Sequence, residues 1–447
     1  MDRIGIGKLK TVLIHTLGCK VNQCESAYMG EVLSRYGFSP ALEGKADICI
    51  VNTCTVTQRA DYQSRQLIRR VIKENPEASI IVTGCCAQIA AGEIASIPGV
   101  DYIIGNKEKA GILHIIKNAS KQISPKIYVS PFTVHDKIQD MCVEGFMDKT
   151  RAFLKIQDGC DAYCTYCIVP YARGRSRSLL PHRVFKHIKL LTQNGYKEIV
   201  LTGIHLGHYG LDLSPQTNIL DLLRTLEEIT HCRIRLSSLE PTELSLSFIR
   251  HMAASKIMCP HLHIPLQSGD DNILKRMNRT YSISYFKDLI HEIIENIPDI
   301  CIGVDVMAGF PGEEEREFIN TYTLIESLPI GYLHVFPYSR RKGTQAFRFP
   351  HHVASATVTA RAKKLRELGN RKRRAFYQKN LRKMAQVLVE CKRDTHTGLL
   401  KGFTKNYIPV LIEGDDDLKN QIVEVELKDI IEDSTYNMKV RGIRTSA

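Results

Sequence analysis

The amino-acid sequence predicts an α/β protein with three domains: an N-terminal parallel-sheet α/β domain, a central partial (β/α)6 barrel and a small C-terminal antiparallel β-barrel. Apolar β-like runs alternate with amphipathic helical runs over the first 120 residues, which is typical of a parallel sheet with crossover helices. The alternation resumes after residue 149 with six new strand–helix units. Beyond residue 380, short alternating runs lie between Gly and Asp clusters, as in small β-barrels.

The first domain is predicted to cover residues 9–120, with strands at 11–15, 47–51 and 79–82. A cysteine follows each strand at nearly the same place, and parallel strands bring their carboxyl ends to one edge of the sheet. The three thiols that we expect to meet at this edge belong to Cys19, Cys54 and Cys85.

Other cysteines of this domain are interpreted as ordinary buried hydrophobic residues, a common role for free cysteine. They are Cys24, Cys49 and Cys86. Cys86 is an alternative to Cys85 as a metal ligand, but the Thr83-Gly84 turn presents Cys85 first. We therefore expect these three cysteines to be dispensable for any metal centre.

Residues 121–148 carry two prolines and little helical periodicity, and they are predicted to be a linker with a short extended piece around Ile127–Ser130. The central domain is predicted to span residues 149–375. Its strand-like runs are 152–157, 198–202, 233–237, 261–266, 301–307 and 332–337, with helical stretches at 183–194, 219–229, 245–254, 270–277 and 314–327. Six units are too few to close an eight-stranded barrel, so we expect an open barrel with its functional residues at the carboxyl ends of the strands.

The first of these strands leads into a C-x3-C-x2-C pattern formed by Cys160, Cys164 and Cys167. A structural zinc site needs four ligands, commonly as two Cys or His pairs, and no such pair lies nearby in the sequence. A 4Fe–4S cluster held by three thiolates leaves one iron free to bind a further ligand. The pattern therefore favours a 4Fe–4S cluster, with a zinc loop or three unrelated buried cysteines as alternatives.

The segment Arg361–Lys383 is dense in Lys and Arg and has helical character, interrupted only by Gly369-Asn370. The net charge of the chain is +13, which favours a polyanionic partner, nucleic acid first and an anionic membrane surface second. We therefore expect this segment to contact phosphate, with a solvated helix face as the alternative. Residues 380–445 are predicted to form the small antiparallel barrel.

The cellular compartment is predicted from the lack of a transmembrane run, the lack of a signal-peptide core, and the cysteine content. No run approaches the ~20 apolar residues of a transmembrane helix, and the first residues lack an apolar signal-peptide core. Fourteen cysteines without an export signal favour a reducing compartment and metal ligation over disulfides. We therefore expect a cytoplasmic protein with no membrane partner.

Several motifs resemble those of the radical SAM (S-adenosylmethionine) methylthiotransferase family, in the family's own domain order. The N-terminal motifs are Thr16–Gln23 (TLGCKVNQ), Asn52–Thr57 (NTCTVT) and Val82–Cys85 (VTGC). The central motifs are Cys160–Cys167 (CDAYCTYC), Pro170–Ser178 (PYARGRSRS) and Pro265–Arg279 (PLQSGDDNILKRMNR). The C-terminal module resembles a TRAM domain, an RNA-binding β-barrel. The resemblance covers nearly the whole chain.

This resemblance implies an enzyme that inserts a methylthio group at an unactivated C–H carbon of a tRNA base, using two 4Fe–4S clusters and SAM. It implies that the SAM-binding cluster is held by Cys160, Cys164 and Cys167. It implies that the auxiliary cluster, which presents the sulfur, is held by Cys19, Cys54 and Cys85. An external electron donor and a sulfur source are implied as partners beside tRNA.

The residue that binds the SAM amino group is less well defined. Many radical SAM enzymes have a Gly-Gly-Glu stretch where this chain has Thr202–Gly207. Glu240, at the end of the third predicted strand, is a candidate, and an ordinary loop carboxylate is the alternative. Candidates to bind an RNA phosphate or the SAM carboxylate are Arg173, Arg175 and Arg177.

The stretches around Cys19 and Cys54 resemble the branch of the family that acts on N6-threonylcarbamoyladenosine just 3′ of the anticodon, giving 2-methylthio-N6-threonylcarbamoyladenosine. The isopentenyl branch typically reads Gly-Cys-Gln-Met-Asn where this chain has Gly18–Asn22. The threonylcarbamoyl group bears a carboxylate, so its pocket should offer a cation, and Lys20 or the three arginines named above are candidates. Alternatives are isopentenyladenosine tRNA, a ribosomal protein side chain, and a non-catalytic metal-stabilised RNA-binding protein.

Overall fold

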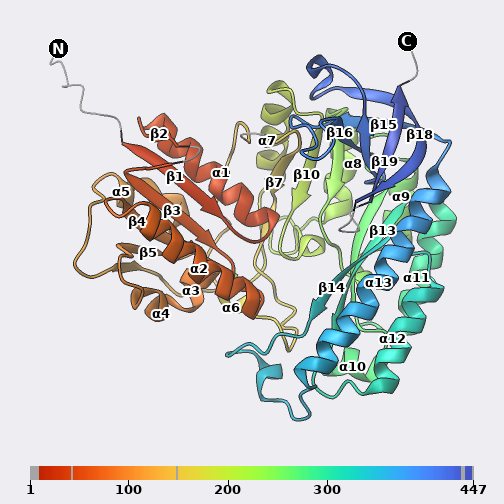
Figure 1. Cartoon of the computed structure of the whole chain (residues 1–447), viewed down its shortest axis with the longest axis horizontal. Helices are drawn as coiled ribbons and strands as arrows, with labels where there is room; N and C mark the ends of the chain where they lie inside the picture. Colours follow the sequence, from red (N-terminus) through yellow and green to blue (C-terminus); the bar gives the residue numbers. More distant parts are fainter. Residues whose placement is uncertain (1–9, 42–43, 147–148, 434–437, 445–447) are drawn as a thin grey trace.

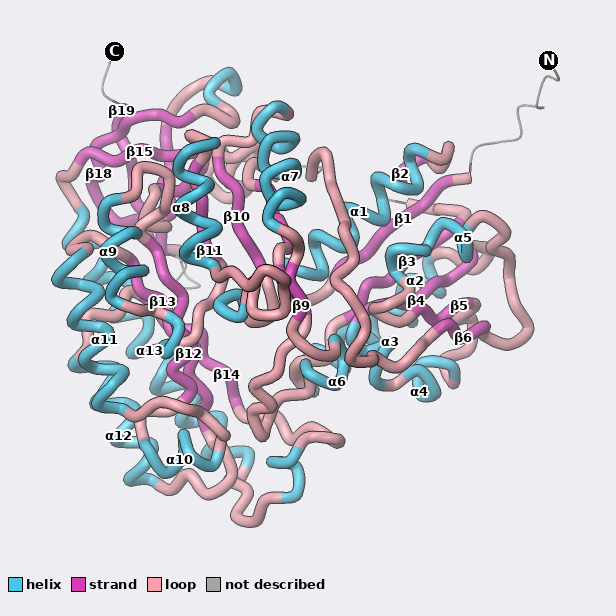
Figure 2. The backbone as a smooth tube through the Cα atoms, turned by 180° about the vertical axis from the view of Figure 1, so that it is seen from behind, coloured by secondary structure: helices cyan, strands magenta, loops and turns pink. Residues whose placement is uncertain are grey.

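A computed structural model gives the fold of the chain and describes residues 10–41, 44–146, 149–433 and 438–444 (Figures 1 and 2). The predicted domain limits at residues 9, 148 and 445 lie outside this part. Figure 1 shows the N-terminal domain beside the central domain, with the C-terminal barrel against one end of the latter. Every helix within the described ranges is too short or too polar to cross a membrane.

The N-terminal domain is a six-stranded parallel sheet in the order β2-β1-β3-β4-β5-β6. Its strands are β1 (Thr11–Thr16), β2 (Ser39–Pro40), β3 (Ile48–Thr53), β4 (Ser79–Gly84), β5 (Tyr102–Ile104) and β6 (Lys126–Tyr128). Its helices are α1 (Lys20–Arg35), α2 (Gln58–Glu74), α3 (Cys85–Ile89), α4 (Ala91–Ala95), η1 (Lys109–Gly111) and α5 (Ile112–Ile116). Strands β3 and β4 are buried along their whole length, because helices cover both faces of the sheet. The predicted parallel α/β domain is confirmed.

The segment predicted to be a linker differs from that expectation at its start. Lys126–Tyr128 pairs in parallel with β5 and closes the edge of the N-terminal sheet as β6. Its side chains are exposed, so the short strand is held mainly by backbone pairing, which carries little sequence signal. The N-terminal sheet therefore extends past residue 120, and only the stretch after β6 connects the two domains.

The central domain contains six parallel strands in chain order, as the sequence predicts. They are β7 (Ala152–Lys155), β10 (Glu198–Thr202), β11 (Arg233–Leu236), β12 (His261–Gln267), β13 (Cys301–Ala308) and β14 (Tyr332–Pro337). They form two three-stranded sheets, β7-β10-β11 and β12-β13-β14, joined by a bridge between Ile234 and Met258. A short antiparallel pair, β8 (Gln157–Asp158) and β9 (Arg177–Ser178), flanks the cysteine loop.

Helices surround these strands, and the sequence analysis overlooked one of the long ones and several short ones. The long ones are α7 (Pro181–Gln193), α8 (Ile219–Ile229), α9 (Leu246–Ala254), α11 (Ile283–Asn296) and α12 (Glu315–Ser327). The shorter ones are α6 (Val169–Arg173), η2 (Leu206–His208), η3 (Pro241–Glu243), α10 (Asp271–Arg276) and η4 (Gln345–Arg348). The overlooked long helix is α11, although Ser282 caps it and Phe286, Leu289, Ile290 and Ile293 form its buried face.

The basic segment is one continuous helix, α13 (Ser355–Asn380), which runs through Gly369-Asn370 without a break. Gly369 is buried against Leu333 of β14, where an added Cβ would lie 3.1 Å from the Leu333 Cβ. The glycine therefore allows close packing of α13 on the barrel and does not interrupt the helix. The helix ends five residues beyond the predicted domain limit at 375, and its last turn packs into the core of the C-terminal barrel through Tyr377.

The C-terminal domain is a closed barrel in the order β15-β16-β17-β19-β18. Its strands are β15 (Met384–Val389), β16 (Leu400–Thr404), β17 (Pro409–Ile412), β18 (Ile422–Glu432) and β19 (Met438–Arg444), and η5 (Asp416–Leu418) lies between β17 and β18. The predicted small antiparallel barrel is confirmed, with one parallel pairing, between β17 and β19. A barrel of five strands cannot close with every neighbour antiparallel, so one parallel pair completes the ring.

The three domains share extensive contacts. Helix α1 of the N-terminal domain packs against β7, and Cys24 of α1 belongs to the hydrophobic core of the central domain. The loop after β14 reaches the other side of the N-terminal domain, where Arg341 pairs with Asp61 at 3.2 Å. The N-terminal domain therefore lies across the opening between the first and last strands of the partial barrel.

Candidate active site

Three strand-end cysteines meet at the carboxyl edge of the N-terminal sheet, as the topology predicts. Cys19 is the N-cap residue of α1, Cys54 follows β3, and Cys85 begins α3 after β4. Gly18 has φ +97°, and a Cβ there would lie 3.0 Å from the Cys54 Sγ, so glycine is needed for the Cys19 loop to approach Cys54. Cys54 and Cys85 are buried, whereas Cys19 is exposed.

The three other cysteines of this domain lie elsewhere. Cys24 packs into the core of the central domain, and Cys49 is fully buried within one face of the N-terminal sheet. Cys86 follows Cys85 directly, but its thiol donates to the Asp61 carboxylate over 3.2 Å. Each of these thiols thus has packing or hydrogen-bond partners of its own, and their dispensability for a metal centre stays a prediction.

Two asparagines hold the strand ends together. The Asn22 side-chain amide donates to the Leu17 carbonyl at 2.8 Å and to the Thr53 carbonyl at 3.0 Å. It therefore ties the loop before Cys19 to the strand end before Cys54. The Asn52 amide in turn donates to the backbone carbonyl of Asn22 at 3.0 Å. Both asparagines are buried, so their hydrogen bonds are shielded from competing water.

The second thiol set lies in the loop after β7 and β8. Cys160 donates its backbone N–H to the Gly174 carbonyl at 3.0 Å, and Cys167 donates to the Cys164 carbonyl at 2.9 Å. Gly159 has φ +78°, and a Cβ there would lie 1.9 Å from the Arg175 carbonyl oxygen, so only glycine fits before Cys160. These bonds fold the loop back on itself, and the Cys164 and Cys160 thiols are electrostatic neighbours of Cys167.

His205 and Glu243, which the sequence analysis did not single out, adjoin the Cys160 thiol. His205 Nδ1 lies 3.3 Å from Cys160 Sγ, and His205 Nε2 lies 2.6 Å from Glu243 Oε1. Burial disfavours the imidazolium, but Cys160 and Glu243 outweigh burial and raise the pKa of His205 to about 10. His205 belongs to Thr202–Gly207, the stretch that departs from the Gly-Gly-Glu pattern. The absence of Gly-Gly-Glu in this stretch was the sequence feature that could have drawn attention to His205.

Glu240 lies beside the same loop and is paired with Arg279. Arg279 Nη1 donates to Glu240 Oε1 at 3.1 Å, and the same Nη1 lies 3.5 Å from Cys164 Sγ. Burial raises the pKa of Glu240 in spite of the attraction of Arg279. The candidate residue for the SAM amino group is thus next to the cysteine loop, and an arginine that the sequence analysis did not name links it to Cys164.

The three arginines considered for RNA or SAM binding have different environments. Arg173 is fully buried and forms ion pairs with Glu25 and Asp158. Its guanidinium is therefore not accessible to RNA, and the expectation that Arg173 contacts phosphate is wrong. Arg177 is buried too and donates to the Arg173 carbonyl at 2.5 Å, with its guanidinium over the Phe132 ring. Arg175 alone is exposed.

Lys20 follows Cys19 at the start of α1 and is half-buried. Partial burial lowers the pKa of its ammonium, and so do the neighbouring Arg151 and Arg235, against the effect of Tyr407. Lys20 has no ion-pair partner within the described residues. Of the cations proposed for a substrate carboxylate, it is therefore the one that is half-buried, close to Cys19 and unpaired.

A hydrogen-bonded row of polar side chains crosses the inside of the barrel. His261 Nε2 lies 2.8 Å from the Tyr332 hydroxyl, which lies 3.1 Å from His263 Nδ1. His263 Nε2 then contacts Asp305 at 2.7 Å, and Asp305 is 3.4 Å from the half-exposed His334. His263 and His334 hold the pKa of Asp305 below its usual range, although burial of the carboxylate opposes this. The interior is therefore polar and suited to a hydrogen-bonding substrate.

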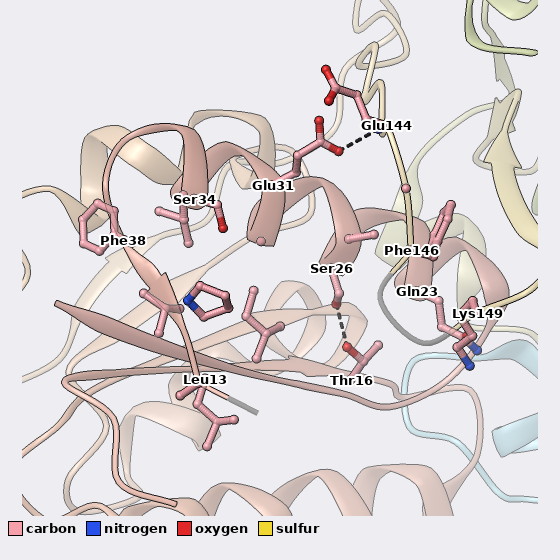
Figure 3. A pocket seen from close by; sticks show the side chains of 18 of the residues that line it. Leu13, Thr16, Gln23, Ser26, Glu31, Ser34, Phe38, Glu144, Phe146 and Lys149 are labelled. Atoms are coloured by element: carbon pink, nitrogen blue, oxygen red, sulfur yellow. Dashed lines mark hydrogen bonds between the residues drawn. The ribbon is translucent and has the colours of Figure 1, made fainter. Parts of the chain in front are cut away.

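A cavity of about 850 Å³ lies along β1 and α1, with residues 144–146 and Lys149 on its other side (Figure 3). The Thr16 hydroxyl donates to Ser26 at 2.7 Å on its wall, and Glu31 accepts the backbone N–H of Glu144. None of the six candidate thiols lines this cavity. It is therefore separate from the cysteine sites, although its lining includes Thr16 and Gln23 near Cys19.

Both thiol sets suit an iron–sulfur cluster. Burial, and then the adjacent Cys85 and Cys19 thiols, raise the pKa of Cys54 to about 11. Burial and the neighbouring Cys164 and Cys160 likewise raise the pKa of Cys167 to about 12. Crowded thiolates of this kind repel one another, and metal cations bound between them remove that cost. Each set supplies three thiols, which leaves one iron of a 4Fe–4S cluster open.

The N-terminal and central domains each match a known protein family. Residues 11–105 match an uncharacterised protein family, UPF0004, and residues 154–325 match the radical SAM superfamily. Of solved structures, the radical S-adenosylmethionine methyltransferase TsrM from Kitasatospora setae, with a SAM analogue bound, is similar with a TM-score of 0.53. The sequences are 13% identical over 73% of each chain, so this likeness concerns the fold.

Curated relatives match over nearly the whole chain. The threonylcarbamoyladenosine tRNA methylthiotransferase MtaB of Bacillus subtilis is 38% identical over 94% of each chain. The protein of the same name from Aquifex aeolicus is 36% identical over 90% of this chain and 97% of its own. A tRNA-2-methylthio-N(6)-dimethylallyladenosine synthase of Clostridium tetani is 34% identical over 93% of each chain.

Proposed function

From the premise that the chain belongs to the radical SAM tRNA methylthiotransferase family, we propose that it inserts a methylthio group at carbon 2 of N6-threonylcarbamoyladenosine in tRNA. Enzymes of this family use SAM and two 4Fe–4S clusters. The observation that carries the proposal is the pair of separate three-thiol sets, one at the carboxyl edge of the N-terminal sheet and one in the loop that follows β7 and β8 of the central domain.

The two thiol sets take different roles in this proposal. Cys160, Cys164 and Cys167 would hold the cluster that binds SAM, and Cys19, Cys54 and Cys85 would hold the auxiliary cluster. When bound, these groups supply a 5′-deoxyadenosyl radical, which removes hydrogen from the base, and the sulfur that is transferred and methylated.

Residues around Cys160, Cys164 and Cys167 orient what binds there. Arg279 sits between Cys164 and Glu240, so it fixes the position of the Glu240 carboxylate beside the loop. We assign Glu240 to the SAM amino group, because it is a partly buried carboxylate next to the cysteine loop. His205 holds a proton between Cys160 and Glu243.

The choice of base is supported by the relatives and by one side chain. The MtaB proteins are named for threonylcarbamoyladenosine, and this chain is 38% identical to the Bacillus subtilis MtaB but 34% identical to the dimethylallyladenosine enzyme of Clostridium tetani. The threonylcarbamoyl group carries a carboxylate, and an unpaired half-buried cation next to Cys19 suits it. We assign Lys20 to this contact.

Transfer RNA is the proposed macromolecular partner, and an external electron donor and a sulfur source complete the reaction. The C-terminal barrel and the net charge of +13 fit a polyanionic substrate. An enzyme that modifies tRNA next to the anticodon would work where tRNA is found, which in a bacterial or eukaryotic cell includes the cytoplasm.

The test offers reconstituted enzyme two purified tRNAs, bearing either threonylcarbamoyladenosine or isopentenyladenosine, with SAM, sulfide and a strong reductant under anaerobic conditions. Mass spectrometry of the nucleosides should show the 2-methylthio product from the first tRNA. Product from the isopentenyl tRNA alone would move the enzyme to the other branch. Cleavage of SAM without product from either tRNA would contradict a tRNA substrate.

A further inference from the structure

A buried guanidinium connects the two thiol sets. Arg173 Nη2 donates to the Asn22 side chain at 2.6 Å, and Arg173 Nη1 donates to Glu25 at 2.9 Å and to Asp158 at 3.0 Å. Asn22 and Glu25 follow Cys19 on α1, whereas Asp158 lies two residues before Cys160. A single side chain therefore bonds to residues beside both sites.

The backbone of α6 makes the same connection. Helix α6 begins two residues after Cys167, and it lies beside α3 of the N-terminal domain (Figure 2). The Asn106 amide donates to the Ala172 carbonyl at 2.8 Å and contacts Cys85 Sγ at 3.7 Å. At the end of the same helix, the Gly174 carbonyl accepts the N–H of Cys160. Thus α6 is tied to Cys85 on one side and to Cys160 on the other.

The charges around Arg173 do not cancel. Three buried cations face two carboxylates: Lys109 is 2.5 Å from Glu25, and Lys155 is 3.1 Å from Glu25 and 3.4 Å from Asp158. Burying such groups is costly, and they are rarely retained for stability alone. The surplus positive charge lies beside the N-terminal thiols. Arg173 bonds to Asn22, three residues after Cys19, and the Asn106 amide that contacts Cys85 also bonds to the carbonyl of Ala172, the residue before Arg173.

We propose that Arg173 and helix α6 are a positioning device that fixes the auxiliary cluster relative to the SAM-binding cluster, and that Arg173 supplies positive charge to the auxiliary cluster. This inference rests on the proposed function. Sulfur can reach the substrate radical only if the two sites keep a fixed separation, since misplacement by about 1 Å can lower a rate 10²-fold. A buried positive charge also favours the electron-rich reduced state of a nearby cluster.

The test replaces Arg173 by Met, which is apolar and of similar length. The variant leaves Lys109 and Lys155 opposite Glu25 and Asp158, so the remaining charges balance and the fold should be retained. We expect both clusters to assemble, and 5′-deoxyadenosine formation to stay within about twofold. Methylthiolated tRNA should fall at least tenfold, so the ratio of the two products reports the loss of positioning.

Electron paramagnetic resonance titration of the two clusters gives a readout that needs no tRNA. In the Arg173→Met protein, the reduction potential of the auxiliary cluster should become more negative, while that of the SAM-binding cluster stays unchanged. Arg173→Lys keeps the positive charge but lacks the second terminal nitrogen, Nη2, which donates to Asn22 in the unsubstituted protein. It should restore the potential and leave the product ratio low.

Arg35→Met is the matched control, because Arg35 also pairs with two carboxylates, Glu31 and Glu144, but is exposed and remote from the thiols. It should change neither the product ratio nor the potentials. Unchanged coupling and potential in Arg173→Met, or loss of both clusters from it, would overturn the proposal. Failure of the unsubstituted enzyme to methylthiolate either tRNA would instead count against the proposed function, and the potentials would still be measurable.

Discussion

At the scale of single residues, position in the sheet decides what a cysteine does. Cys49 and Cys54 lie five residues apart, yet Cys49 is inside β3 with its thiol in a hydrophobic core, whereas Cys54 follows the strand at its carboxyl edge. Both are buried. Burial alone therefore does not distinguish a candidate ligand from a core residue, and proximity to the other strand-end thiols does.

This contrast gives a paired prediction for the N-terminal site. Cys54→Ala should retain SAM cleavage but form no methylthiolated tRNA, because the auxiliary cluster loses a ligand. Cys49→Ala should remain active and lose about 1 kcal/mol of stability, since it removes one sulfur atom from a packed core. Iron analysis and nucleoside mass spectrometry measure both effects. Full product formation by Cys54→Ala would remove this residue from the cluster.

The reciprocal prediction concerns the loop of the central domain. Cys160→Ala, Cys164→Ala and Cys167→Ala should each abolish 5′-deoxyadenosine formation and leave about four irons per chain after reconstitution, the content of one 4Fe–4S cluster. The two sets lie on separate sheets with separate cores, so one cluster should assemble without the other. Continued SAM cleavage by any of these variants would contradict the assignment.

Lys20 gives a prediction about substrate choice. Lys20→Met removes the unpaired cation, so the KM for tRNA bearing threonylcarbamoyladenosine should rise roughly tenfold or more, about the loss of one charge-assisted hydrogen bond of ~1.5–3 kcal/mol. Formation of 5′-deoxyadenosine without tRNA should not change. An unchanged KM would show that the carboxylate is bound elsewhere.

At the scale of secondary-structure elements, the sequence predicted what local patterns encode. The six strands of the partial barrel agree with the predicted runs within about two residues, because apolar runs bounded by turns are a strong signal. Helix α11 carried an equally clear pattern, a serine cap and an apolar stripe, and could have been found. For strand β6 the sequence predicted an extended piece around Ile127–Ser130, but not its pairing with β5, because its exposed residues carry no sign of the neighbouring strand.

The contacts within the candidate site were harder to predict than the thiols themselves. The three strand-end cysteines follow from topology, since parallel strands end at one edge. The burial of Arg173 depends on Glu25, which is 148 residues away in the chain, and nothing local to the arginine indicates that partner. The pairing of Arg279 with Glu240 is likewise a product of the tertiary fold.

The segment between the domains gives a prediction about pH. His187 of α7 lies 2.9 Å from Asp140 and fixes this segment to the barrel. Burial disfavours the charged imidazole, but Asp140 and Cys142 outweigh burial and raise the pKa of His187 to about 9. Because the folded pKa exceeds the unfolded value of ~6.5, this stabilisation is complete below pH ~6.5 and is lost as pH rises through about 9. We expect a loss of about 1–2 kcal/mol, discounted because Asp140 is partly exposed.

Urea unfolding at pH 6 and pH 9 measures this loss, with His187→Gln as the comparison. The variant should be less stable at pH 6 and should lack the His187 contribution to the pH dependence. If the unsubstituted protein and the variant lose the same stability between these pH values, the Asp140–His187 pair does not titrate as stated.

At the scale of the whole molecule, the domains are built into one another. Arg235 inside the partial barrel donates to the Lys405 carbonyl at 3.0 Å, and its guanidinium stacks over Tyr407 of the C-terminal barrel. Helix α13 packs on β14 and then enters the C-terminal core. Deletion after residue 380 would therefore expose buried surface in the central domain, so point variants in the full chain are the cleaner test of RNA binding.

The distribution of charge revises the expectation for α13. Many of its basic side chains contact the protein: Arg361 is buried against Glu313, Arg371 pairs with Glu326, and Arg374 pairs with Glu432. Lys379 donates to a backbone carbonyl. A dense run of Lys and Arg in the sequence thus overstates the charge available to RNA, because these tertiary partners lie far away in the chain.

The last prediction concerns tRNA binding by the full chain. Affinity should fall steeply with salt, because each phosphate that is neutralised adds roughly −0.7 to −0.9 to the slope of log affinity against log salt concentration. Arg366 and Arg382 are exposed and have no ion-pair partner among the described residues. Arg366→Gln and Arg382→Gln should each weaken binding and make the slope shallower by about one contact. Arg374→Gln, the control, removes a cation already paired with Glu432 and should change the slope less. Equal slopes for all three variants and the unsubstituted protein would place the phosphate contacts outside α13 and its junction with the barrel.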